Sequence, residues 1–73
     1  MKDGQIPDLS EREQEVLELM IEGRSNDQVA LSLEITRRTV EFHVTNILVK
    51  LDVTSRTQAV AAAVQKGWFD EGE

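Results

Sequence analysis

Three serines in this chain of 73 residues are each followed, three positions later, by Glu or Gln. These pairs are Ser10 with Glu13, Ser25 with Gln28, and Ser55 with Gln58. In a capping box of this kind, the serine side chain accepts a bond from an unpaired amide of the first helical turn, and the Glu or Gln side chain reaches back to the serine amide. Apolar residues at helical spacing follow each pair, so the pattern predicts helices and not strands.

Thr36 supplies a fourth helix start, and Gly23 and Gly67 are placed to end the first and last helices. We expect helices near residues 10–22, 26–33, 37–51 and 56–66, which together form an all-α fold, a compact four-helix bundle containing a helix-turn-helix. Trp68, directly after Gly67, fits the apolar contact that accompanies a Schellman-type helix end. The expected inward residues are Val16, Leu17, Met20, Ile21, Val29, Ala30, Leu33, Val40, Val44, Ile47, Leu51, Val60, Ala63 and Val64.

The composition excludes several classes of protein. The chain has no cysteine, one histidine and no Gly-rich phosphate loop, so we expect no enzyme, no cofactor and no metal site. No segment approaches the roughly 18 apolar residues that a membrane span needs, so we expect no membrane partner and a cytoplasmic location. We expect residues 1–8 to be a flexible tail or the end of a linker, 9–69 the domain, and 70–73 a disordered acidic tail.

The net charge of −6 is unevenly distributed along the sequence. Residues 1–34 carry three basic and nine acidic side chains, whereas residues 35–66 carry five basic and two acidic ones. Four glutamates, at positions 11, 15, 18 and 22, share one face of the first helix. This face is either solvated or a cation site, and solvated faces are the commoner case. The basic segment is the part that could approach a phosphate backbone.

The helices at 26–33 and 37–51 are joined by a turn of about three residues, which is the layout of a helix-turn-helix. With the apolar stripe of helix 37–51 turned inward, Arg38, Glu41, Phe42 and Thr45 face outward near its N-terminus. Helix N-termini favour phosphate, and the first turns of recognition helices contact bases. His43 lies between the two faces, and could either pack against a neighbour or touch a phosphate.

Residues 9–60 resemble the LuxR-type DNA-binding domain. The motifs are Leu-Ser-x-Arg-Glu-x-Glu-Val-Leu from Leu9, Gly-x-Ser-Asn from Gly23, Thr-Val-x-x-His-Val-x-Asn-Ile from Thr39, and Lys-Leu-x-Val from Lys50 with Arg56 three residues further on. The resemblance implies a four-helix domain that binds double-stranded DNA as a dimer, on an inverted repeat, for transcription regulation. Such domains occur in response regulators, quorum sensors and small free-standing regulators, and RNA polymerase is a further partner that this role implies.

Transferred by position, the resemblance implies two sets of DNA contacts. The base-facing residues would be Glu41, Phe42 and Thr45, with Arg38 on the same face. Many members carry Lys where Glu41 stands, so the base contacts expected here are less electrostatic. The phosphate-facing residues would be Ser25, Asn26, Arg37, Thr39, Asn46, Lys50 and Arg56.

The helix at 56–66 contains six consecutive apolar residues, which cover its whole circumference. One stripe is left over from the core, and the resemblance implies that it forms a two-fold dimer contact; the alternative is Ala-rich filler without a partner. The expected dimer residues are Thr57, Ala61, Val64 and Gln65. Two other functions stay open: a protein-interaction module of the same fold that has lost DNA affinity, and a piece resembling domain 4 of a sigma factor.

Overall fold

The computed structural model describes residues 8–69, in which four helices follow one another along the chain. They are α1 (Glu11–Ile21), α2 (Asn26–Leu33), α3 (Arg37–Lys50) and α4 (Arg56–Lys66). The bounds differ from the expected ones by one residue at most, and the all-α fold is confirmed. Apart from Asp8, the predicted tails at 1–8 and 70–73 lie outside the described residues.

The expected capping residues start all four helices. Ser10 and Ser25 form complete capping boxes with Glu13 and Gln28. Ser55 accepts a bond from the Gln58 amide, but the Gln58 side chain accepts bonds from Thr54 and not from the Ser55 amide. The third box is therefore only half formed, although the helix begins where the sequence predicts.

All four helices end with the two backbone bonds of a Schellman motif. The expected end at Gly67 is confirmed, with the Trp68 amide bound to the Ala63 carbonyl at 3.1 Å. The same arrangement occurs at Gly23, and also at Glu34 and Asp52, which adopt left-handed backbone angles with φ of 60° and 58°. Neither of those two positions carries the glycine that usually marks such an end.

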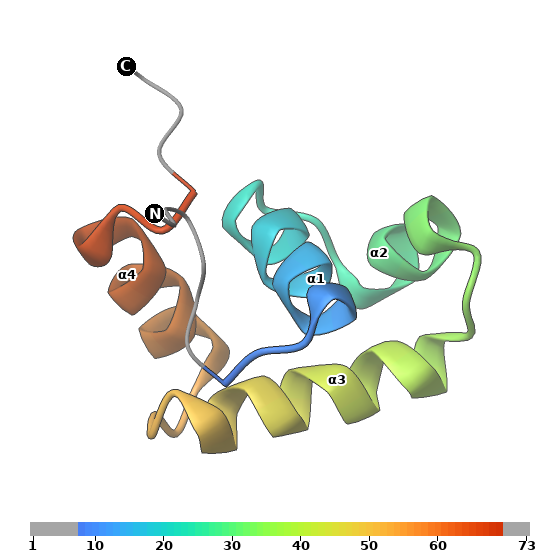
Figure 1. The fold of residues 1–73 in the computed structure, drawn as a ribbon. Helices are drawn as coiled ribbons and strands as arrows, with labels where there is room; N and C mark the ends of the chain where they lie inside the picture. Colours follow the sequence, from blue (N-terminus) through green and yellow to red (C-terminus); the bar gives the residue numbers. More distant parts are fainter. Residues whose placement is uncertain (1–7, 70–73) are drawn as a thin grey trace.

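α3 is the longest helix and lies along one side of the molecule (Figure 1). α1 and α2 pack against its inner side, and α4 packs against α1 and α3. No other described element covers the outer side of α3 in Figure 1. The fold therefore presents one complete helix face to the outside.

The core lies between the four helices and involves most of the expected residues. Val44, Leu51, Leu33, Ile21 and Val60 are only half-buried at its edge. One expectation is wrong, because Val64 is 61% exposed. α4 instead approaches the core through two small residues, Ala59 and Ala63, which turns Val64 outward. The buried apolar residues are Leu9, Val16, Leu17, Met20, Val29, Ala30, Val40, Ile47, Ala59 and Ala63.

Candidate nucleic-acid interface

The outer face of α3 carries the four side chains that the sequence placed there. Arg38, Glu41, Phe42 and Thr45 are all exposed. Phe42 is 63% exposed, so its ring is available to a partner that covers this face. These side chains project from the first three turns of α3, the geometry by which a recognition helix contacts base edges.

Val49 extends this face by one turn and was missed by sequence reasoning. It is 72% exposed, and it follows Arg38, Phe42 and Thr45 at steps of four, three and four residues. That spacing was the available signal, because residues three and four apart share one side of a helix. The outer face of α3 therefore carries two exposed apolar side chains, Phe42 and Val49, separated by two turns.

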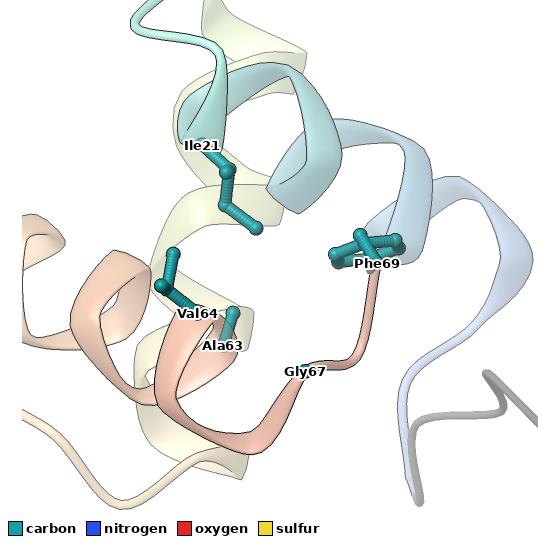
Figure 2. A pocket seen from close by; sticks show the side chains of 5 residues that line it. All are labelled: Ile21, Ala63, Val64, Gly67 and Phe69. Carbon is teal, nitrogen blue, oxygen red and sulfur yellow. The ribbon is translucent and has the colours of Figure 1, made fainter. Parts of the chain in front are cut away.

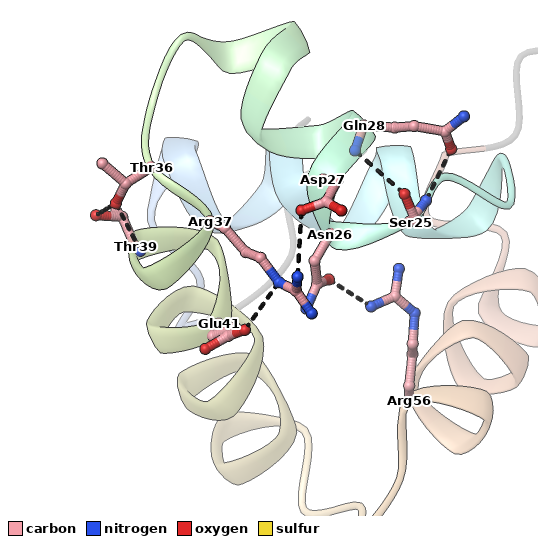
Figure 3. Close-up of polar contacts among 9 residues, drawn as sticks. All are labelled: Ser25, Asn26, Asp27, Gln28, Thr36, Arg37, Thr39, Glu41 and Arg56. Atoms are coloured by element: carbon pink, nitrogen blue, oxygen red, sulfur yellow. Dashed lines mark hydrogen bonds and ion pairs between the residues drawn. The ribbon is translucent and has the colours of Figure 1, made fainter.

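The Arg37 guanidinium lies between two carboxylates (Figure 3). Its Nε donates to Glu41 Oε2 at 3.2 Å, one turn further along α3. One of its terminal nitrogens lies 3.5 Å from Asp27 Oδ1, in the first turn of α2. Arg37 therefore links the start of α2 to the outer face of α3, and its charge is shared with two acids.

Lys50 is held by a buried carboxylate on another helix. Its Nζ donates to Glu13 Oε1 at 2.8 Å, and Glu13 is only 5% exposed. Burial by itself acts to raise the pKa of Glu13, but hydrogen bonds from Lys50 and the Ser10 amide, together with the charge of Lys50 and the nearby His43 ring, lower this pKa below its usual value. The lysine that the resemblance places near phosphate thus also ties α3 to α1.

Arg56 fastens the start of α4 to the start of α2 (Figure 3). Its terminal nitrogens donate to Asn26 Oδ1 and to the Arg24 carbonyl, both at 2.6 Å. These acceptors are neutral, so the positive charge of Arg56 is not cancelled. Ser25, at the N-terminus of the same α2, accepts from the Gln28 amide with its hydroxyl. The first turn of α2, Arg56 and the start of α3 therefore lie on a common side of the molecule.

Comparisons with known proteins identify the family of this domain. The family described as bacterial regulatory proteins of the luxR family matches residues 7–63. This chain belongs to the luxR family. It provides a DNA-binding domain of the LuxR type for transcription regulation.

Individual relatives and a solved structure support the assignment. The transcriptional regulatory protein DegU of Brevibacillus brevis is 48% identical over 60 residues, which are 82% of this chain and 25% of that protein. The response regulator protein VraR of Staphylococcus aureus is 53% identical over 57 residues, 78% of this chain and 27% of that protein. The structure of the transcription factor GerE superposes with a TM-score of 0.75 at 32% identity, covering 82% of this chain and 90% of that one. The chain spans about a quarter of the length of the curated relatives it matches.

Three other candidate residues of this LuxR-family domain lie at the margins of the α3 face. The Thr39 hydroxyl lies 2.9 Å from that of Thr36 and takes part in the cap of α3. Asn46 is half-buried, and so is His43, whose Nδ1 is buried and has no hydrogen-bond partner among residues 8–69. His43 thus lies between the two faces, as the sequence predicted, with its ring 6.0 Å from that of Phe42.

The outer side of α4 is exposed along the stripe expected to form a dimer. Thr57, Ala61, Val64 and Gln65 are all exposed and share one side of the helix. Val64 also lines an apolar cavity of about 330 Å³ between the ends of α1 and α4 (Figure 2). The other lining residues are Ile21, Ala63, Gly67 and Phe69.

Within residues 8–69, no helix is both long enough and apolar enough to cross a bilayer. The described residues also contain no group of three His, Cys, Asp or Glu side chains arranged to hold a metal ion.

Proposed function

We propose that this domain binds double-stranded DNA sequence-specifically, with α3 in the major groove, and that two copies dock on an inverted repeat through α4. The observation that carries the proposal is the outer face of α3, which is exposed along the helix and is joined at its start to the first turn of α2 through Arg37 and Asp27 (Figure 3). Because its ligand is chromosomal DNA, the domain acts in the cytoplasm.

Base recognition would come from Glu41, Phe42 and Thr45, with Arg38 beside them. A Glu carboxylate can accept a hydrogen bond from the N4 amine of cytosine, and an apolar side chain can pack on the methyl group of thymine. Phe42 supports this assignment, since an aromatic ring exposed at 63% in the middle of the face has no packing role that accounts for its exposure.

Positioning on the duplex would come from the residues around that face. Arg56 is the best prepared phosphate ligand, because neutral acceptors fix its orientation while its charge stays available. Lys50 shares its charge with Glu13. The further phosphate ligands that we propose are Ser25, Asn26, Thr39 and Asn46, and Arg37 lies beside them at the start of α3.

The dimer would form through Thr57, Ala61, Val64 and Gln65. The exposure of Val64 supports this surface, because an apolar side chain beside a cavity loses water contact when a second copy covers it. The stripe is narrow and two of its residues are polar, so we expect weak self-association without DNA. An isologous contact of this kind places two recognition helices about one DNA turn apart, or about 34 Å.

The test is a selection of this protein against a random duplex library at low salt, followed by sequencing. We expect an inverted repeat whose half-sites are about 10 base pairs apart. Selection of a single unrepeated motif would support sequence-specific DNA binding and refute the dimer. No enrichment, from protein shown to be folded, would refute the proposal and favour the protein-interaction module.

Two variants separate the parts of the proposal. Glu41→Ala should change the preferred base at one position of each half-site, and an unchanged motif would refute the role of Glu41. Ala61→Glu should weaken binding to the inverted repeat more than binding to an isolated half-site, because it places charge in the dimer contact. An equal loss on both duplexes would count against the dimer.

A further inference from the structure

Lys50 contacts the buried Glu13 and Arg56 contacts neutral oxygens, whereas Arg37 lies between two exposed carboxylates. Both of its contacts are carboxylates, and one of them, Glu41, is a proposed base-reading residue. All three side chains are more than half exposed. The contacts therefore join three surface groups and are not required to fill the core.

The two carboxylates approach different nitrogens of the guanidinium. Glu41 accepts from Nε at 3.2 Å, and Asp27 Oδ1 lies 3.5 Å from a terminal nitrogen (Figure 3). The guanidinium is planar and its donors are fixed in direction, so contacts at two of its nitrogens restrict its orientation. Asp27 is itself placed favourably, because an acidic side chain in the first turn of a helix interacts well with the helix dipole.

Glu41 needs such a neighbour if it is to lie in a DNA groove. A carboxylate brought close to phosphates is repelled, and the repulsion grows as water leaves the interface. A cation that donates to the carboxylate offsets this repulsion and narrows the range of orientations in which the free oxygen can accept a bond from a base. Arg37 is one turn before Glu41 and satisfies both requirements.

We propose that Arg37 is a positioning residue for Glu41, held in place by Asp27, and that it acts on base preference through Glu41 instead of neutralising a phosphate. This inference rests on the proposed function, in which Glu41 reads a base. It reassigns Arg37 from the phosphate-facing set to the base-reading set.

The experiment is a double-mutant cycle on DNA affinity with Arg37→Gln, Glu41→Gln and the double variant. On the duplex selected by the unmodified protein, Arg37→Gln should weaken binding about three- to tenfold in the presence of Glu41, and less than about twofold in the Glu41→Gln background. The motif selected by the Arg37→Gln variant should lose its base preference at the same position at which the Glu41→Gln variant loses it. The slope of log affinity against log salt should stay unchanged, because no phosphate contact is lost.

Arg38→Gln is the matched control, since Arg38 is the adjacent arginine and has no ion pair within residues 8–69. Its effect should be the same in the unmodified protein and in the Glu41→Gln background. If Arg37→Gln instead weakens all duplexes alike and lowers the salt slope by about one per protomer, Arg37 is a phosphate ligand and the inference is overturned.

A measurement without DNA separates this inference from the proposed function. The Arg37 Nε–H resonance in a ¹⁵N-labelled domain should shift upfield and exchange faster with water in Glu41→Gln, because its charged acceptor is gone. An unchanged resonance would overturn the inference alone. A domain that selects no duplex would overturn the inference together with the proposed function.

Discussion

Replacing Glu13 with Ala should destabilise this domain more than any other change to a charged residue of α1. The carboxylate is buried, and its Oε1 accepts from the Ser10 amide at 3.0 Å and from Lys50 Nζ at 2.8 Å. A hydrogen bond to a charged group contributes about 1.5–3 kcal/mol. We place the Lys50 bond at the lower end, because the Lys50 side chain is 37% exposed and its ammonium group regains water when the partner is removed.

Loss of the reciprocal capping contact adds roughly 0.5–1 kcal/mol, so the total should be about 2–3 kcal/mol. For a domain of this length, 1 kcal/mol shifts the midpoint of thermal unfolding by roughly 4–8 °C, and the expected decrease in Tm is therefore about 10–20 °C. The assay is thermal and urea denaturation followed by far-UV circular dichroism. The matched control is Glu15→Ala, also on α1, which breaks only the exposed ion pair with Arg12 and should cost under about 0.5 kcal/mol.

The pH dependence of the Glu13 effect gives a second test. The pKa of Glu13 is lowered in the folded protein, so its contribution is fully present above the unfolded pKa of about 4.3 and is lost as the pH falls through the lower folded pKa. The stability gap between the unmodified protein and Glu13→Gln should therefore be constant near neutral pH and narrow below about pH 4. The reasoning is refuted if Glu13→Ala unfolds at the same temperature as Glu15→Ala, or if the gap does not narrow in acid.

Three further substitutions test other features of the fold by urea denaturation. Glu34→Gly should stabilise the domain by about 0.5–1 kcal/mol, because φ at this position is 60°, and a loss of stability would contradict the strain argument. Ala63→Leu should lower the free energy of unfolding by about 1–3 kcal/mol, because it overpacks the core, whereas Ala61→Leu on the exposed side of α4 should change stability little. Equal effects of the two substitutions would show that Ala63 does not face the core. Arg56→Lys should lower the free energy of unfolding by about 1 kcal/mol, because lysine retains the charge but cannot contact Asn26 and the Arg24 carbonyl at the same time. An unchanged stability would show that these two contacts do not hold α4 to the start of α2.

The sequence predicts helix starts well because a capping pair is a local signal. Ser10, Ser25, Thr36 and Ser55 each bind an amide three residues away, so no distant part of the chain is needed to identify them. Helix ends are harder to predict from the sequence than helix starts. Glu34 and Asp52 adopt left-handed angles within Schellman-type hydrogen bonds, and neither position carries the glycine that would mark the helix end in the sequence.

The tertiary partners of the charged residues could not be predicted in the same way. Glu13 is 37 residues from Lys50, and Arg56 is 30 residues from Asn26. The capping pattern placed Glu13 in a cap, and the family resemblance placed Lys50 near phosphate. Their mutual contact depends on how α1 crosses α3. The prediction that Val64 faces the core was wrong for a related reason. On a helix that is apolar on all sides, periodicity identifies the stripes but does not determine which of them faces the core.

The contacts of the cations explain how an acidic domain can present a surface to DNA. Arg37 and Lys50 face carboxylates, so a phosphate near either one must compete with an existing acceptor. Arg56 is held by neutral oxygens, and Arg38 is exposed without an ion pair among residues 8–69. The positive potential available to a phosphate backbone is thus concentrated at the starts of α3 and α4, where helix dipoles add to it. Under the proposed function, few phosphates are neutralised per protomer, and we expect discrimination between sequences to come mainly from the fit of the α3 face to the base edges and less from long-range attraction.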